Sequence, residues 1–241
     1  MSASATEVSL HNRLLQALPA ADYQRLVPRF RRVELPRGRI ICEAGDPADY
    51  VYFPVRGVVS LLSITEDGES IEVGMVGNEG ATGVPIITRS GRAPYRAVVQ
   101  IPADALRCEA GVLRSEFEGG SPLTRVILSY TEALFTQIAQ SAVCNRFHST
   151  EERLCRWLLC TRDRVESDII ELTHESISNM LGTQRPVVSA TAAVLQRKGL
   201  ISYGRGAIKI VNRPGLEFAA CECYRIVRES MTSSLEPIQS M

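Results

Sequence analysis

Residues 172–198 constrain the fold of this chain most, because they hold two helical patterns separated by a single glycine. Thr173 is suited to cap the first helix, and Gly182 follows it where a left-handed residue permits a sharp turn. Thr183 is then expected to cap the second helix. The buried face of the first helix would consist of Ile177, Met180 and Leu181. This order of helix, tight turn and helix predicts a helix-turn-helix.

Two runs of alternating apolar residues follow, at positions 200–203 and 207–211, joined by Gly204-Arg205-Gly206. Such runs around a glycine-containing turn predict a β-hairpin, which extends the unit to a winged helix-turn-helix. The net charge of the whole chain is zero, but residues 171–213 carry a surplus of four positive charges. A local basic surplus is what a phosphate-facing surface requires.

In a helix-turn-helix, the N-terminal part of the second helix enters the DNA major groove. Arg185 lies in that part and is predicted to bond a guanine edge, with a solvated or phosphate-only arginine as the alternative. Arg197 and Lys198 lie at the other end, where they also complement the helix dipole without DNA. The residues predicted to contact DNA are Thr173, His174, Thr183, Gln184, Arg185, Ser189, Arg197, Lys198 and Arg205.

Between residues 33 and 108 the chain consists of short β-rich runs separated by turn signals. The runs cover residues 39–42, 50–53, 58–64, 70–76 and 95–101. Asp67-Gly68, between the third and fourth runs, is a strong hairpin signal. Many short strands at such intervals predict an antiparallel barrel or sandwich.

A segment with helical periodicity runs from Pro122 to His148 and would be about 40 Å long. That length exceeds what a small β-domain needs to cover itself, so its apolar stripe is predicted to pack against a second copy of the chain. Packing within one subunit remains the alternative. The predicted dimer interface consists of Ile127, Tyr130, Leu134 and Ile138. The stripe ends near residues 145–149, which predicts a hinge followed by a new cap at Ser149 or Thr150.

The composition, with 45% hydrophobic and 22% charged residues, is typical of a soluble globular protein. The N-terminal residues do not have the pattern of a signal peptide, and the apolar runs are too short to span a bilayer. The chain is therefore expected to be cytoplasmic, with no membrane partner. Seven cysteines at irregular spacings do not indicate a secreted disulfide framework.

Catalytic functions find little support in the sequence. A metal-dependent β-roll enzyme needs two or three histidines with a carboxylate, but residues 33–108 contain no histidine. The chain also lacks a Ser-His-Asp set, a phosphate loop and a paired-histidine metal motif. We therefore expect that the protein is not an enzyme. A winged helix that binds protein instead of DNA is a further alternative.

The cysteines and histidines also do not favour a metal or haem sensor. An iron–sulfur cluster needs neighbouring cysteines, but none precedes Cys42, and Cys221-x-Cys223 lies beyond the wing. A haem would need a placed ligand, and His11 is the only early histidine. We therefore predict no metal and no evident cofactor. A thiol switch formed by Cys42 and Cys108 stays as an alternative.

Over residues 14–217 the chain resembles the Crp–Fnr family of bacterial transcription regulators. One part of the resemblance is similar to the opening of a cyclic-nucleotide-binding β-roll: Leu35-Pro36-Arg37-Gly38-Arg39-Ile40, Gly45-Asp46, Val51-Tyr52 and Arg56-Gly57-Val58-Val59. The other part is the helix-turn-helix with its wing. The resemblance implies a homodimer that reads a two-fold operator with half-sites about 34 Å apart. It also implies RNA polymerase as a partner besides double-stranded DNA.

The chain departs from the family's cyclic-nucleotide signature. Members that bind such ligands have a Gly-Glu pair for the ribose and an arginine for the phosphate, whereas this chain has Gly83-Val84 and Tyr95. Arg96 is displaced by one residue, which sends a strand side chain to the opposite face. A cyclic nucleotide is therefore doubtful as the effector, which stays unidentified. The candidate effector-binding residues are Glu79, Tyr95 and Arg96.

Two positions of the second helix also differ from many relatives. Pro186 and Ala190 stand where those relatives carry a glutamate and an arginine, so a different operator is expected.

These observations predict an α+β protein in four parts. Residues 1–121 would form a sensory antiparallel β-roll, a double-stranded β-helix or jelly roll, and residues 122–148 a dimerisation helix. Residues 149–217 would form the winged helix-turn-helix, and residues 218–241 a C-terminal extension. The end of that extension, from Ser230, is expected to fray.

Overall fold

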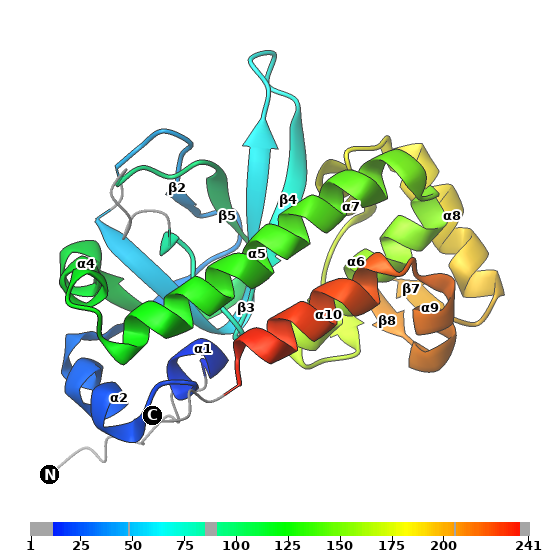
Figure 1. Ribbon diagram of the computed structural model, residues 1–241. Coiled ribbons are helices and arrows are strands. Elements are labelled where there is room, and N and C mark those ends of the chain that lie inside the picture. Colours follow the sequence, from blue (N-terminus) through cyan, green and yellow to red (C-terminus); the bar gives the residue numbers. More distant parts are fainter. Residues whose placement is uncertain (1–11, 48, 85–90, 205, 237–241) are drawn as a thin grey trace, which may run out of the picture.

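The structure, a computed structural model, describes residues 12–47, 49–84, 91–204 and 206–236 (Figure 1). Its first half begins with three short helices, α1 Arg13–Gln16, α2 Ala20–Leu26 and a 3-10 turn Val27–Arg29. The strands that follow are β1 Arg31–Leu35, β2 Ile40–Cys42, β3 Tyr50–Ile64, β4 Ser70–Val76 and β5 Arg96–Glu109. They form one antiparallel sheet in the order β1-β5-β3-β4, with β2 also paired to β5.

Strand β3 joins two runs that the sequence presents as separate strands. The pairing of β3 with β5 shifts register between Pro54 and Val58. Gly57 lies in this irregular stretch at a φ of +84°, and a Cβ there would come within 2.3 Å of the Pro102 carbonyl oxygen. The glycine therefore allows the strand to bend and continue, where the sequence alone suggests a turn.

The second half is mainly helical (Figure 1). It consists of α4 Ala110–Glu118, α5 Pro122–Phe147, α6 Thr150–Val165, β6 Ile169–Ile170, α7 His174–Leu181, α8 Arg185–Arg197, β7 Ile201–Gly204, β8 Ala207–Ile210, α9 Arg213–Ala219 and α10 Cys223–Ser234. Ser149 caps α6 reciprocally with Glu152, which confirms the cap expected after the long helix. Together the β-roll and the helices confirm the α+β fold.

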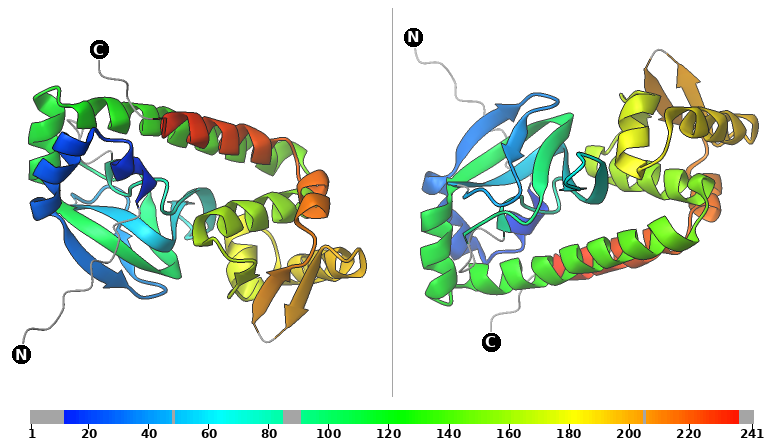
Figure 2. Two further views of the ribbon diagram at one scale, coloured as in Figure 1. Left: turned by 90° about the horizontal axis from the view of Figure 1, so that it is seen from below. Right: turned by 90° about the horizontal axis from the view of Figure 1, so that it is seen from above.

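Helix α10 lies alongside α5 in both views of Figure 2. Val227 and Met231 of α10 are buried in the same hydrophobic cluster as the core of the β-roll. Fraying from Ser230 was therefore a wrong prediction as far as Ser234, because an apolar face of the extension packs on the long helix. Residues 223–234 were not predicted to form a helix.

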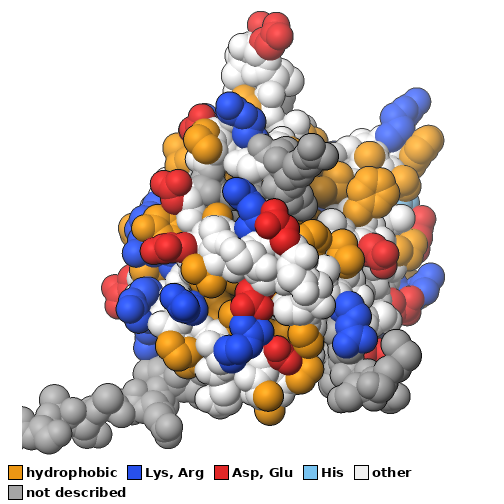
Figure 3. Space-filling model, turned by 60° about the vertical axis from the view of Figure 1, so that its left-hand side comes forward, with side chains coloured by type: hydrophobic (Ala, Val, Ile, Leu, Met, Phe, Trp, Pro, Cys, Tyr) orange, Lys and Arg blue, Asp and Glu red, His pale blue; other side chains and the backbone are white. Residues whose placement is uncertain are grey.

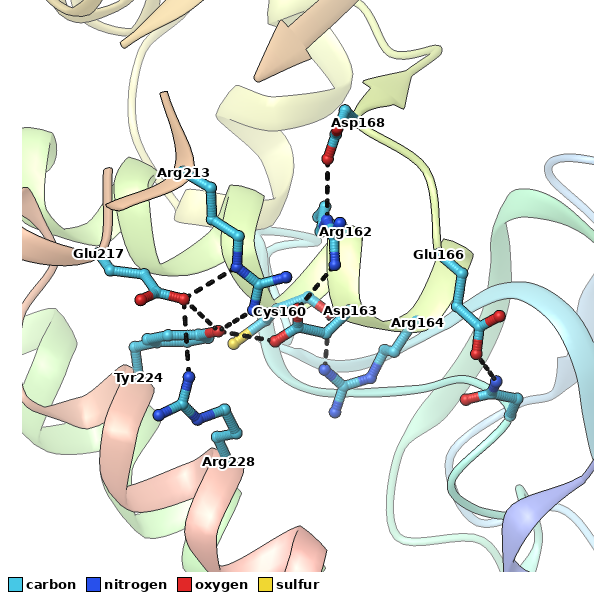
Figure 4. Close-up of polar contacts among 11 residues, drawn as sticks. Cys160, Arg162, Asp163, Arg164, Glu166, Asp168, Arg213, Glu217, Tyr224 and Arg228 are labelled. Atoms are coloured by element: carbon cyan, nitrogen blue, oxygen red, sulfur yellow. Dashed lines mark hydrogen bonds and ion pairs between the residues drawn. The ribbon is translucent and has the colours of Figure 1, made fainter. Parts of the chain in front are cut away.

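A polar network fastens α9 and α10 to α6 (Figure 4). Asp163 of α6 accepts a hydrogen bond from the Tyr224 hydroxyl at 2.8 Å and pairs with Arg213 at 3.0 Å. Glu217 pairs with the same Arg213 at 2.9 Å and with Arg228 at 3.6 Å. The C-terminal extension is thus attached both to α5 and to the helical domain that contains α7 and α8.

Glu72 joins the β-roll to the helical domain. Its buried carboxylate on β4 accepts a hydrogen bond from the Trp157 indole of α6 at 2.8 Å and another from the Ser60 hydroxyl. Burial raises the pKa of Glu72 to about 7, although the bonds from Ser60 and Trp157 lower it. The protein therefore takes up a proton at Glu72 on folding between about pH 4.5 and pH 7.

Replacing Glu72 with glutamine should stabilise the protein near neutral pH. Because the folded-state pKa is raised, the contribution of Glu72 to stability is complete below about pH 4.5 and is lost as the pH rises towards 7. Glutamine keeps an acceptor for Trp157 without a charge, so roughly 3 kcal/mol should be regained at pH 8 and little at pH 4.5. Urea unfolding at both pH values measures this difference.

Glu69, which is exposed and directly precedes β4, provides the matched control. Glu69→Gln should leave the pH dependence of the unfolding free energy as it is in the natural chain. Equal pH dependence in the natural chain and in Glu72→Gln would contradict the assignment.

Candidate nucleic-acid interface

Local hydrogen bonds explain how the two helices meet. The Thr173 hydroxyl caps α7 by accepting from the Ser176 amide at 3.1 Å, as predicted. Gly182 ends α7 at a φ of +57°, and the Thr183 amide donates back to the Ser178 carbonyl at 3.0 Å. These bonds form the left-handed helix end that the sequence predicts.

The predicted cap of the second helix is wrong. Gln184, not Thr183, is the N-cap of α8, and its side chain makes no capping bond. Helix α8 begins at Arg185, and the Thr183 amide donates to the Ser178 carbonyl, so Thr183 belongs to the closing turn of α7. The turn is therefore one residue longer than expected.

The first turn of α8 is exposed. Gln184 and Arg185 lie at the surface, and Arg185 has a loose pair at 3.7 Å with Glu175, which is itself exposed. The opposite side of α8 is anchored in its own domain by Val188, Ala192 and Leu195. Its main contacts are with α6, α7 and β7. The end of α8 that would meet base edges is therefore presented outward.

His174 and Ser189 connect the elements of this unit. The His174 Nδ1 atom lies 2.9 Å from the Ser189 hydroxyl of α8, and the imidazole stacks on Tyr203 of β7 at 3.9 Å between ring centroids. Burial and the nearby charge of Arg185 lower the pKa of His174. A neutral, partly buried imidazole is better suited to position α8 against the wing than to attract a phosphate by charge.

The remaining predicted contacts lie at the other end of α8 and on the wing. Arg197 is exposed, whereas Lys198 pairs with Glu151 of α6. Strands β7 and β8 confirm the hairpin, and β6 extends it to a three-stranded sheet that the sequence analysis did not predict. Arg205, which lies between β7 and β8 in the sequence, is outside the described residues, so its contact with DNA stays a prediction.

The β-roll lacks the local surplus of positive charge that the helix-turn-helix segment carries. Over the face shown in Figure 3, basic and acidic side chains are interspersed. The basic surplus of residues 171–213 is thus a local property of the helix-turn-helix segment and not of the whole surface.

A groove of about 360 Å³ lies between the β-roll and α5. Its described lining consists of Ser63, Val73, Pro94, Tyr95, Thr131, Leu134, Phe135 and Ile138, none of which is basic. Arg96 points elsewhere and pairs with Glu43 at 2.6 Å on the surface. A cyclic phosphate placed in this groove would find no cation among these residues.

The three candidate effector residues do not form one site. Tyr95 lines the groove and is buried, whereas Arg96 lies on the other face of the strand. The Glu79 carboxylate is buried 2.7 Å from the Arg164 guanidinium of α6. Grouping these residues was therefore wrong, because strand alternation and the ion pair direct them to different places.

The predicted dimer interface is also largely wrong. Ile127, Tyr130 and Leu134 are only 1%, 0% and 5% exposed, because they pack on the β-roll of their own subunit. The Tyr130 hydroxyl even donates to the Ala81 carbonyl at 3.1 Å. Ile138 is partly buried. The alternative that the sequence analysis left open, packing within one subunit, applies to this stripe.

A second apolar face of α5 remains exposed. Leu128 and Phe135, seven residues apart, are 50% and 71% exposed. Thr131 and Ala142 are also exposed, and Ile138 lies between them at helical spacing. Spacings of three and four along one exposed face are those of a two-helix seam. We refer to these five residues as the α5 outer stripe.

All seven cysteines are buried and none forms a disulfide. Cys42 and Cys108 are buried, and burial raises the pKa of both thiols, that of Cys108 to about 11, which does not favour a thiol switch. Four other residues, Cys144, His148, Cys221 and Cys223, come together at one end of α5. The Cys-x-x-x-His spacing on a helix and the Cys-x-Cys pair were the signals that could have indicated this cluster.

Comparison with known proteins agrees with this architecture. The family described as "Cyclic nucleotide-binding domain" matches residues 32–118, and the one described as "Crp-like helix-turn-helix domain" matches residues 152–219. The Global nitrogen regulator of Synechococcus elongatus is 26% identical over 189 residues, which are 74% of this chain and 85% of that protein.

Solved structures are similar over most of their length. FixK2 from Bradyrhizobium japonicum gives a TM-score of 0.66 at 19% identity and covers 80% of this chain and 98% of its own. A transcriptional regulator of the CRP/FNR family from Thermus thermophilus gives 0.62 at 18% identity, with coverage of 79% and 98%.

Proposed function

The chain belongs to the Crp–Fnr family of DNA-binding transcription regulators, and from this premise we propose that it acts as a homodimer on a two-fold operator. One α8 helix of each protomer would enter the major groove, at half-sites about 34 Å apart. The observation that carries this proposal is the exposed first turn of α8, with Arg185 beside a basic segment. A regulatory and not a catalytic role follows.

The outer stripe of α5 supports the dimer. Leu128 and Phe135 are exposed in the single protomer, where a second copy of the same helix can bury them. Thr131, Phe135 and Ile138 also form the α5 wall of the groove beside the β-roll. Like residues would meet across a two-fold axis, as a parallel two-helix seam requires. This seam replaces the predicted one, of which only Ile138 is kept.

We propose that each of the four segments of the sequence has its own role. Residues 1–121 would sense, residues 122–148 would dimerise, residues 149–217 would bind DNA, and residues 218–241 would brace the long helix. RNA polymerase would be a further partner. Among the described residues, the helices are too short or too polar to cross a bilayer. We place the protein in the cytoplasm because its DNA target is there.

We expect no binding of cyclic AMP or cyclic GMP in calorimetry with the full-length protein. The groove beside α5 has a size that suits a small ligand, but its described lining is apolar or neutral. An effector at this groove would therefore be an uncharged molecule. Heat from either cyclic nucleotide at millimolar concentration would contradict this expectation.

Selection of bound sequences from a random duplex pool tests the proposed function. The full-length protein should enrich a single motif with two inverted half-sites whose centres lie one helical turn apart. Enrichment of one half-site alone would contradict the homodimer. Failure to retain any duplex at low salt would contradict DNA binding itself.

A further inference from the structure

Four potential metal ligands converge where α5 ends and α10 begins. Cys144 and His148 lie four residues apart on the same side of the end of α5, and Cys221 and Cys223 lie at the start of α10. One ligand atom of each residue lies within 4.8 Å of those of the other three. The three cysteines are buried, and the histidine is partly buried. This cluster is separate from the DNA-binding face and from the groove beside α5.

The spacing of the ligand atoms suits a single tetrahedral ion. The Cys144 and Cys221 sulfurs are 3.6 Å apart, and the Cys223 sulfur is 3.6 Å from the His148 Nδ1 atom. Zinc–sulfur bonds of about 2.3 Å place two tetrahedral sulfur ligands roughly 3.8 Å apart. These two separations therefore differ from those of a tetrahedral zinc site by a few tenths of an ångström at most, and all four ligand atoms lie within 4.8 Å of one another. An iron–sulfur cluster, which spreads its ligands around several irons, would require wider separations.

The surroundings of the cluster also match those of a metal site. The other imidazole nitrogen of His148, Nε2, lies 3.4 Å from the Glu222 carboxylate. A carboxylate behind a ligating histidine fixes its orientation and the nitrogen that faces the ion. The partly buried Arg156 of α6 donates a hydrogen bond at 3.3 Å to the hydroxyl of Ser141, which lies one helical turn before Cys144.

The charges balance when a divalent ion binds. Three thiols would release their protons to solvent, and three thiolates with a neutral imidazole and a divalent cation leave one negative charge. The Arg156 guanidinium, which bonds Ser141 at the same end of α5, would offset that charge. The ligand set of three sulfurs and one nitrogen is that of a closed structural zinc site, because no coordination position is left for substrate or water.

We propose that Cys144, His148, Cys221 and Cys223 bind one zinc-class ion that fastens the end of α5 to the start of α10. Because α10 is attached to α6 through Asp163 and Tyr224, the ion would brace the junction between the long helix and the DNA-binding domain. This junction contains His148 and Ser149, where the sequence predicts a hinge. The site would thus limit the freedom of the DNA-binding domain relative to α5.

Titration of the full-length, reduced, chelator-treated protein with Co²⁺ tests the proposal directly. One equivalent should produce the strong visible bands of tetrahedral cobalt together with near-ultraviolet sulfur-to-cobalt absorption, and Zn²⁺ should remove both. Cys223→Ser and, independently, His148→Ala should weaken binding by at least about 100-fold, and Glu222→Gln by about 10-fold. Far-ultraviolet circular dichroism establishes that each variant is folded.

Cys42→Ser is the matched control, because Cys42 is also buried but lies in the β-roll. It should bind cobalt as the natural chain does, and Zn²⁺ should raise its melting temperature equally. Absence of the tetrahedral spectrum in the reduced natural chain would overturn the proposal. So would an unchanged spectrum in Cys223→Ser and His148→Ala. A Cys144–Cys221 disulfide that forms in place of metal binding would overturn it as well.

Discussion

Replacing Arg185 with alanine should remove most of the preference of the protein for its operator over unrelated DNA. Arg185 is exposed on the first turn of α8, and its pair with Glu175 at 3.7 Å is too loose and exposed to hold it. A bidentate contact with guanine contributes about 1–3 kcal/mol of discrimination. Because a dimer has two such contacts, the ratio of specific to non-specific affinity should fall by roughly 30-fold to 10⁴-fold.

Fluorescence anisotropy with the selected operator and a scrambled duplex measures that ratio. Arg197→Ala is the matched control, because Arg197 is an exposed arginine at the far end of the same helix. Loss of a phosphate contact there should weaken binding to both duplexes alike and reduce the salt dependence by about one ion per protomer. If Arg185→Ala weakened binding to both duplexes equally, Arg185 would be a phosphate contact and the proposed base contact would be wrong.

Local signals made the helix-turn-helix predictable. The Thr173 cap and the left-handed Gly182 are determined by residues within a few positions of each other, and the structure contains both. The displaced cap at Gln184 shows the limit of such signals, because threonine favours a cap position but the closing turn of α7 extends through Thr183. Cap propensity alone does not fix the exact residue at which a helix begins.

The orientation of the long helix was not predictable in the same way. Helix α5 has apolar residues on two sides, and its period does not tell which side faces the β-roll. Tyr130 and Phe135 are both large and aromatic, but one is fully buried and the other is 71% exposed. The difference arises from tertiary packing against the loop that contains Ala81.

The cluster at the end of α5 shows the same limit at longer range. Cys144 and Cys221 are 77 residues apart in sequence and 3.6 Å apart between sulfurs. Their meeting depends on α10 returning along α5, and the sequence analysis predicted no such helix. In the sequence the Cys-x-Cys pair beyond the wing is far from its partners, Cys144 and His148, which lie at the end of the predicted long helix.

The second large effect is expected at Phe135, where glutamate should produce a folded monomer. Phe135 is 71% exposed and lies at the centre of the α5 outer stripe, so glutamate costs the isolated subunit little. In a two-fold seam, however, two carboxylates would face each other without solvent or a partner. Light scattering should give half the mass of the natural protein. At a protein concentration low enough to dissociate the natural dimer, both proteins should show the same thermal unfolding curve by circular dichroism.

Loss of the dimer should weaken operator binding by about 10²- to 10⁴-fold, because the second half-site is then no longer held at high effective concentration. Phe218→Glu is the control, since Phe218 is 94% exposed on α9 and lies outside the stripe. It should remain dimeric and bind the operator normally.

Leu134 distinguishes the two faces of the same helix. It is 5% exposed and packs on the β-roll, so Leu134→Glu should bury an unpaired charge and unfold the subunit, not merely separate two copies. A folded monomer from Leu134→Glu, together with a persistent dimer from Phe135→Glu, would mean that the inner stripe forms the seam. In that case the helix would have to rotate away from the β-roll when the dimer forms.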